Sequence, residues 1–317
     1  MTKVNLQFLD VGWGDAHLIR LPSGCLTLID GGDGTVSPDQ DHPVSWMDRQ
    51  GIEHLDWLIL THIHEDHLNG LLDIARAKSV SKAVLPYEPF KLMPEKVIEQ
   101  HGNDLTKRVY GMLTAYLELI HLLGQQGTEI LWRNECGTSE QAVLWSEEGV
   151  SLTHLYPWAG DPLPAYETLL KSCEGDDLRA LESFFDLSND DSSVYRLSFT
   201  QDPDKSILFG GDQLEAGWER LAQRMDIQSW VWKVSHHGLP DGFNPRLISL
   251  IKPAHCIIPI SADRSENLRP AWESLRSCTD AAFYVTGHTG GTNPQRIESE
   301  SAIIEIGYGA KPSDPHK

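Results

Sequence analysis

A cluster of metal-binding residue types directly follows an apolar run in the first quarter of the sequence. The segment THIHEDHLNG, residues 61–70, comes after LDWLIL at 55–60, which has the length and composition of a buried strand. Within six positions it contains His62, His64, Asp66 and His67. The whole chain has 14 histidines in 317 residues, so this density is improbable by chance. The fold must therefore bring the end of a strand to a polar centre.

Spacing within this segment predicts a metal site. In extended backbone His62 and His64 point to the same side of the chain, because side chains alternate with a period of two. Asp66 and His67 follow at the start of a predicted helix, and a turn would fold them back beside the first pair as two adjacent metal sites. Imidazole and carboxylate ligands without cysteine favour zinc, manganese or iron. A polar loop that happens to be rich in histidine is the alternative.

Composition and charge restrict the function further. The sequence is 40% hydrophobic and 23% charged, as in an ordinary globular protein, and no run of about 18 apolar residues predicts a membrane span. Five scattered cysteines predict neither a disulfide framework nor a thiolate metal site, so we expect a cytoplasmic protein. The formal net charge of −20 repels polyphosphates. A nucleic-acid substrate would need a local basic patch, metal ions or a partner protein to hold it.

The rest of the chain alternates between strand and helix patterns. Short apolar runs fill the first sixty residues, and helices are predicted at 67–78, 105–123, 214–225, 244–251 and 270–277. Residues 157–191 are irregular in pattern and rich in acidic residues, which predicts a solvated surface insertion. We expect one α/β domain over residues 1–317 that carries this insertion.

The spacing His-x-His-x-Asp-His after a strand resembles the signature of the metallo-β-lactamase fold, a superfamily of mostly hydrolytic enzymes. This resemblance implies an αββα four-layer sandwich with one or two metals at one edge. It is strongest for the ComEC-like hydrolases, the hydrolase domain of bacterial DNA-uptake proteins and its stand-alone relatives. The other segments that carry it are FLDVGWGDAHLI at 8–19, LIDGG at 28–32, NDDSSVYRL at 189–197, ILFGGD at 207–212 and KVSHHG at 233–238.

The resemblance implies a role for each residue of the cluster. His62 and His64 would bind a first divalent metal, and Asp66 and His67 a second. Asp212 would bridge the two, since a carboxylate at a strand end can offer one oxygen to each cation. The implied cofactors are two divalent ions, zinc or manganese.

Two neighbouring histidines compete for the last position of the second site. If the strand continued through them, His236 and His237 would point to opposite faces, and either could complete the site. We favour His236 as the metal ligand and assign to His237 a contact with a substrate oxygen or leaving group. Asp66 and His237 are therefore the predicted catalytic residues.

Three more residues are predicted to surround the metals or to contact the substrate. Asp30 is either a turn residue or a carboxylate that accepts the free ring N–H of a metal-bound histidine. Asn189 stands where most of the superfamily has a third histidine for the first metal, so it is a weaker ligand or a turn cap. Lys233 is either a surface cation or a neighbour of the metal ligands. A tight turn with a purely architectural role is predicted for Asp10, Gly12, Gly14 and Asp15.

The implied activity is hydrolysis by a metal-activated water. Such a site serves phosphodiesters, β-lactams, lactones and thioesters alike, so it does not name the substrate. Our first hypothesis is a phosphodiesterase, specifically a nuclease that receives nucleic acid from a partner protein. The second is a hydrolase of a small phosphoester, of the phosphorylcholine or cyclic-nucleotide type. The third is a catalytically weak subunit that works with an ATPase or another protein of phage defence or DNA processing, without a membrane partner.

Overall fold

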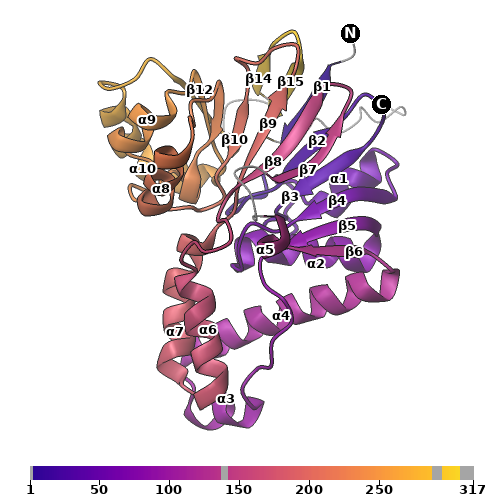
Figure 1. Ribbon diagram of the computed structural model, residues 1–317, viewed down its shortest axis with the longest axis vertical. Coiled ribbons are helices and arrows are strands. Elements are labelled where there is room, and N and C mark those ends of the chain that lie inside the picture. The colour runs from indigo at the N-terminus through magenta and orange to yellow at the C-terminus, as the bar shows by residue number, and fades with distance from the viewer. Residues whose placement is uncertain (1–2, 137–141, 288–294, 308–317) are drawn as a thin grey trace.

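Two β-sheets form the centre of the molecule (Figure 1). A computed structural model describes residues 3–136, 142–287 and 295–307. Within these ranges, the first sheet has eight strands, in spatial order β14 (Gln295–Glu298), β15 (Ala302–Ile306), β1 (Val4–Phe8), β2 (His17–Arg20), β3 (Leu26–Ile29), β4 (His54–Ile59), β5 (Ser79–Leu85) and β6 (Glu129–Trp132). The second has seven, in the order β13 (Ala282–Val285), β12 (His255–Ile258), β11 (Val231–Lys233), β10 (Ile207–Phe209), β9 (Val194–Phe199), β8 (Val150–Tyr156) and β7 (Ala142–Glu147).

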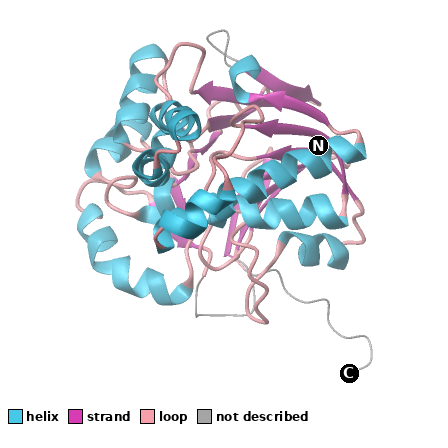
Figure 2. Ribbon diagram, turned by 90° about the horizontal axis from the view of Figure 1, so that it is seen from below, coloured by secondary structure: helices cyan, strands magenta, loops and turns pink. Residues whose placement is uncertain are grey.

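Helices cover the outer face of each sheet (Figures 1 and 2). On the first sheet lie α1 (Pro43–Arg49), α2 (Glu65–Ala77) and α4 (Asp104–Gln126), and the short α5 (Arg133–Cys136) follows β6. Beside the sheet, α3 (Glu95–His101) and α7 (Leu178–Leu187) pack on α4, and α6 (Pro164–Gly175) packs on α7. On the second lie α8 (Glu215–Arg224), α9 (Pro245–Ile251) and α10 (Ala262–Leu275). The layers are therefore helix, sheet, sheet and helix, which confirms the αββα sandwich.

Alternating side chains on the central strands fill two different cores. In β10, Ile207 and Phe209 belong to the core between the sheets, whereas Leu208 belongs to the core under α8, α9 and α10. The ring of Phe209 stacks on that of Phe8 from the other sheet, with 5.9 Å between centroids. Because both faces are buried, such strands are continuous apolar runs in the sequence.

We expected residues 157–191 to be irregular, but most of them are helical. They form α6, α7 and a 3-10 turn, η1 (Ser188–Asp191), and they bury Leu169, Leu181 and Phe184 in the core that α4 also enters. Exposed acidic residues lie between these apolar positions and obscure the helical period in the sequence. The segment packs as a helical pair on α4, beside the sandwich (Figure 1). That the chain forms one domain stays a prediction.

The sheet topology brings several loops to one edge of the molecule. In the first sheet β3, β4, β5 and β6 run parallel, and in the second β10, β11, β12 and β13 do. Loops after the carboxyl ends of parallel strands share an edge, where α/β sheets usually hold their ligands. Among the described residues, no helix combines the length and the apolar character needed to cross a membrane.

Candidate metal centre

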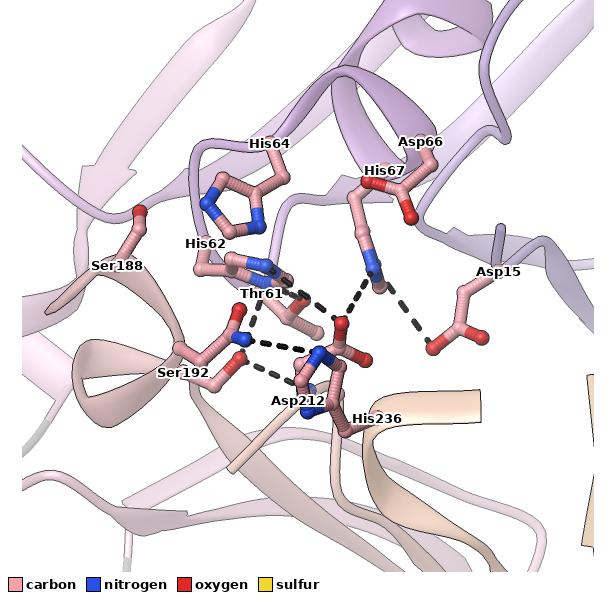
Figure 3. A network of polar contacts seen from close by, with 12 residues as sticks. Asp15, Thr61, His62, His64, Asp66, His67, Ser188, Ser192, Asp212 and His236 are labelled. Atoms are coloured by element: carbon pink, nitrogen blue, oxygen red, sulfur yellow. Dashed lines mark hydrogen bonds and ion pairs between the residues drawn. The ribbon is translucent and has the colours of Figure 1, made fainter. Parts of the chain in front are cut away.

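The histidine cluster lies where the loops after β4, β10 and β11 meet, and Figure 3 shows its side chains turned toward one another. Three groups of ligand-type atoms lie there, each within 4.8 Å, and one of them, Asp15, Asp30 and His67, lies behind the other two on the far side of the His67 ring. Of these two, the first group is His62, His64 and Asp212, and the second is Asp66, His67, Asp212 and His237. Asp212 belongs to both groups, in the bridging position that the resemblance implied.

Distances within the second group suit a shared cation. Asp212 Oδ2 lies 3.3 Å from Nε2 of His67 and 3.3 Å from Nε2 of His237. Asp66 Oδ2 lies 3.2 Å from the same His237 atom. Two ligands bound to zinc at about 2.0–2.1 Å in tetrahedral geometry are about 3.3 Å apart. The Nε2 atoms of His62, His67 and His237 are buried without a hydrogen-bond partner among the described residues, as metal-binding atoms would be.

The other ring nitrogen of each buried histidine contacts a neighbouring group. These contacts join His67 Nδ1 to Asp30 Oδ2 (2.9 Å), His62 Nδ1 to Ser192 Oγ (2.9 Å) and His237 Nδ1 to the carbonyl oxygen of Pro259 (2.9 Å). A carboxylate or carbonyl accepts the Nδ1 proton and leaves Nε2 bare on the side of the cluster. The protein thus orients these rings before any ligand arrives.

Asp30 contacts the ring of His67, as the second of its two predicted roles requires. Besides His67, its carboxylate accepts hydrogen bonds from the backbone N–H and the hydroxyl of Thr61, each 2.8 Å long. Its own backbone is left-handed, with φ of 57°, a conformation that aspartate tolerates better than most residues do. Asp30 therefore ties the end of β3 to both the loop after β4 and the first turn of α2.

His64 is oriented by a different element. Its Nε2 lies 3.0 Å from the carbonyl oxygen of Phe185 in α7, so Nδ1 is the atom that faces Asp212. The imidazole also lies 4.5 Å from the Phe185 ring, centroid to centroid. The acidic segment that we expected to be a surface insertion therefore helps to build the site.

The structure places His237, and not the predicted His236, among the ligand-type atoms. Strand β11 ends at Lys233, and His236 and His237 both adopt left-handed backbone, with φ of 50° and 51°, in the turn η2 (Ser235–Gly238). The strand geometry that we assumed does not apply. His237 is fully buried in the second group, whereas Nδ1 of His236 lies 2.8 Å from Asp241. His237 thus replaces His236 as the candidate ligand, whereas His236 belongs to neither group and its partly exposed side chain lies at the rim of the cluster.

Lys233 is not a surface cation. It is fully buried, its Nζ forms an ion pair with Asp15 and donates a 2.8 Å hydrogen bond to the carbonyl oxygen of Gly211, and it lies 3.7 Å from Asp212 Oδ1. Asp15, which we expected to be only architectural, also lies 3.5 Å from His237 Nδ1. The ammonium group therefore offsets part of the negative charge under the cluster and holds Asp212 by one oxygen.

Sequence reasoning assigned no role to two hydroxyl groups. Ser192 Oγ lies 2.9 Å from His62 Nδ1 and accepts the backbone N–H of Asp212 at 3.0 Å, and Thr61 Oγ1 lies 3.2 Å from His62 Nδ1. Ser192 belongs to the segment NDDSSVYRL, so its place in that motif was the available signal. It joins the loops after β4 and β10.

The side chain of Asn189 contacts His236 and not the backbone of the turn in which it lies. Its Nδ2 is 3.2 Å from His236 Nε2, and its Oδ1 is buried without a hydrogen-bond partner among the described residues. The side chain lines the same cavity as His64 and Asp212. Of its two predicted roles, the turn cap has no support, and that of a weak ligand stays a prediction.

Burial and nearby carboxylates give the histidines different pKa values. Burial holds the pKa of His62 well below its ordinary value of 6.5, and it also lowers the pKa of His64. Burial acts in the same direction on His67 and His237, but the carboxylate of Asp212 and its acidic neighbours outweigh it. The pKa of His67 is held well above 6.5, and that of His237 rises to about 10. A cation in the second group must therefore displace protons.

A cavity of about 290 Å³ opens above the cluster. It is lined by Trp13, His64, Asp66, Arg108, Phe185, Asp186, Asn189, Asp212, His236 and His237. Two cavities elsewhere on the molecule, of about 360 and 270 Å³, contain none of the clustered histidines. The ligand-type atoms are therefore reached through this cavity.

The first part of the chain carries a family signature. Residues 10–127 match the profile described as the Metallo-beta-lactamase superfamily. This part of the chain is similar to the metallo-β-lactamase superfamily. The matched part includes Asp30 and the cluster from His62 to His67, whereas Asp212 and His237 lie beyond it.

Individual proteins are also similar to this chain, at low sequence identity. ComE operon protein 3 of Bacillus subtilis (strain 168) is 27% identical over 165 residues, which cover 45% of this chain and 20% of that protein. The structure of CmlA, a diiron β-hydroxylase from Streptomyces venezuelae, is 13% identical with a TM-score of 0.46, and the match covers 89% of this chain and 52% of CmlA. The structure of a diphosphatase of the PhnP family is 14% identical with a TM-score of 0.43, and the match covers 87% of this chain and 82% of the diphosphatase. The chain thus matches a fifth of the length of the first relative and about half of the second.

Proposed function

We propose that the chain is a metal-dependent phosphodiesterase, and within that class a nuclease of the ComEC-like type. The observation that supports this proposal is the pair of ligand groups that share Asp212 at the floor of a cavity. Two divalent cations held there would lower the pKa of water and offset negative charge on a phosphoryl group. We assign His62, His64 and Asp212 to one cation and Asp66, His67, Asp212 and His237 to the other.

The protein's own groups hold this arrangement in place. Asp30 and Ser192 orient the rings of His67 and His62, and Lys233 restrains Asp212 through one oxygen. Because these partners are themselves buried, the reacting groups need little reorganisation when a substrate binds.

His236 takes the substrate role that we first gave to His237. It lies at the rim of the cavity, and the carboxylate of Asp241, 2.8 Å from Nδ1, orients its ring. An imidazole held in this way by a carboxylate is suited to give a proton to a leaving oxygen. We therefore assign His236, and no longer His237, to proton transfer.

Hydrolysis of bis(p-nitrophenyl) phosphate tests this proposal. We expect turnover with Mn²⁺ or Zn²⁺, its loss after chelation, and inhibition by single-stranded DNA that competes for the cavity. Metal binding without turnover of any phosphodiester would exclude the enzymatic proposal and support the catalytically weak subunit. Turnover that DNA does not inhibit would favour the small-phosphoester hydrolase, an alternative that suits a cavity of about 290 Å³ on a chain of net charge −20.

The negative charge also bears on the proposed partners. A chain of net charge −20 has to receive nucleic acid against its own field, so we propose delivery by a partner, an ATPase or another protein of defence or DNA processing. We further propose a cytoplasmic location, since the five cysteines are all unpaired thiols.

A further inference from the structure

Each ligand group has one histidine that packs against the ring of a phenylalanine or tryptophan, and an arginine stacks on that ring. In the first group, His64 lies 4.5 Å from the ring of Phe185, and the guanidinium of Arg108 lies 4.8 Å from the centroid of that ring. In the second group, His237 lies 4.6 Å from the ring of Trp13, and the guanidinium of Arg264 lies 3.9 Å from it. The same three-part arrangement thus occurs in both halves of the site.

Glu65 holds Arg108 in place but leaves some of its N–H donors free. Its Nε donates a 2.7 Å hydrogen bond to Glu65 and its Nη2 forms an ion pair with the same carboxylate, while Nη1 has no partner among the described residues. Of the side chains that line the cavity, Arg108 is the sole lysine or arginine. An arginine fixed on one edge presents its remaining N–H groups to an anion in the cavity.

Arg264 has even fewer partners. It is exposed at the start of α10, and its guanidinium makes no hydrogen bond within the part of the chain that the structure describes. Stacking on Trp13, whose ring lines the cavity, keeps it beside the second ligand group. Arg108 therefore places positive charge in the lining of a cavity that also contains Asp66, Asp186 and Asp212, and Arg264, which is outside that lining, places it on the ring of Trp13.

We infer that Arg108 and Arg264 are substrate-binding residues that hold the phosphates on either side of the attacked one. This inference rests on the proposed phosphodiesterase function and refines it. The substrate is a strand of consecutive phosphodiesters rather than an isolated phosphodiester, because a single anionic group between the two ligand groups would leave Nη1 of Arg108 and the guanidinium of Arg264 without an acceptor. A lone structural ion pair, the alternative for Arg108, gives no reason for the matching arginine on Trp13.

The test compares two substrates that differ only in their flanking phosphates. Thymidylyl-thymidine has one phosphodiester, and tetrathymidylate has a central phosphodiester with one on each side. We expect Arg108→Ala and Arg264→Ala each to raise KM and lower kcat/KM for tetrathymidylate about tenfold, as for loss of a charge-assisted hydrogen bond, and to change hydrolysis of thymidylyl-thymidine less than twofold. Arg108→Lys keeps the charge and recovers part of the loss.

Arg76→Ala is the matched control. Arg76 is exposed to a similar extent as Arg108 and also pairs with a glutamate, Glu118, but it lies outside the cavity. We expect no change with either substrate. Equal losses on both substrates, or no loss on tetrathymidylate, would overturn the inference while the phosphodiesterase proposal stands.

A binding experiment separates the two proposals if no phosphodiester is cleaved. Fluorescence anisotropy of labelled tetrathymidylate with the Zn²⁺-loaded protein then gives the answer. Binding that each arginine variant weakens about tenfold would keep the inference and refute the enzymatic function. Binding that is unaffected by both variants would refute the inference as well.

Discussion

At the scale of residues, the position of each side chain decides which members of the cluster are candidates to bind metal. His237 and His236 are neighbours, but His237 is buried among Asp66, Asp212 and Asp15, whereas His236 lies at the rim. We expect His237→Ala to lower the bound metal to about one ion per chain, and Asp66→Ala with His67→Ala to remove most of the metal, because loss of a ligand lowers affinity by about 10–100-fold or more. Elemental analysis of the purified variants measures this.

His236→Ala is the control for that experiment. We expect it to keep the metal of the wild type and to lose turnover, since we assign it to proton transfer. Unchanged metal in His237→Ala together with metal loss in His236→Ala would restore the original assignment of the pair.

Asn189 tests the strength of the first metal site. An amide oxygen is a weaker zinc ligand than imidazole, so we expect Asn189→His to tighten Zn²⁺ binding about tenfold or more in titration calorimetry. Asn189→Ser, which keeps a polar oxygen but cannot reach as far, is the control. If the histidine variant binds Zn²⁺ no better than the serine variant, the side chain at 189 does not reach the metal.

Protonated histidines give the metal-free protein a distinct pH dependence. A folded-state pKa of about 10 for His237, above the ordinary 6.5, means that its charged form adds stability below pH 6.5 and that this stability is lost as the pH rises toward 10. We expect the melting temperature of chelated protein to fall between pH 7 and 10, and to fall less in His237→Gln. Differential scanning fluorimetry measures both, and equal slopes would show that His237 is not the titrating group.

The cluster itself could be predicted from sequence because its residues are local. His62, His64, Asp66 and His67 lie within six consecutive positions, in the loop after β4 and the first turn of α2, so a two-residue period and a helix start were enough to bring them together. The choice between His236 and His237 depended on backbone dihedral angles in η2, to which apolar periodicity gives no access. The burial of Lys233 beside Asp15 depended on contacts across both sheets.

At the scale of elements, close approach of α2 to the loop after β3 requires glycine. A Cβ at Gly70 would lie 1.8 Å from the carbonyl oxygen of Gly31, whereas a Cβ at Gly111 in α4 would meet nothing within 4 Å. We expect Gly70→Ala to lower the free energy of unfolding by about 2–3 kcal/mol, since backbone must move to admit the methyl group. Urea unfolding measures the change.

Gly111→Ala is the control, because Gly111 also lies inside a helix but has open space where its Cβ would lie. We expect it to raise the free energy of unfolding by about 1 kcal/mol, because alanine is the better helix former and the site is open. Destabilisation of the same size in both variants would mean that α2 does not approach the loop as closely as the structure shows.

Elements were predictable where the apolar period was strong. α4, with its buried stripe including Val109, Tyr116 and Leu123, matches the helix predicted at 105–123. α6 and α7 were missed because their acidic exposed faces dominate the composition, and α10 begins eight residues before the predicted start because its first turns are largely polar and exposed. The period is weak where a helix buries only a few side chains.

At the scale of the whole molecule, the four layers follow from strands that are apolar on both faces. Such strands need cover on each side, and the sequence supplies helices before and after them. The position of β15, with its neighbour β14, beside β1 arises from pairing of β15 with β1 between residues about 300 positions apart. Local patterns do not report such pairing, so only the resemblance to a known fold anticipated it.

The net charge and the two arginines act on a nucleic-acid substrate over different distances, so we expect cleavage to depend on salt in two opposite ways. The field of a chain with net charge −20 repels a long strand, and this repulsion weakens as the Debye length falls from about 30 Å at 0.01 M salt to about 10 Å at 0.1 M. Contacts of Arg108 and Arg264 with phosphates weaken at higher salt, because bound counterions are then released less favourably.

Initial rates with a labelled twenty-nucleotide strand should therefore rise and then fall as salt is increased, whereas rates with bis(p-nitrophenyl) phosphate, which carries one charge, should change little. Adding a basic partner protein should remove the rising limb, since it cancels the long-range field and leaves the local contacts. A rate that falls steeply from the lowest salt onward would instead indicate a positively charged track that outweighs the net charge along the path of the strand.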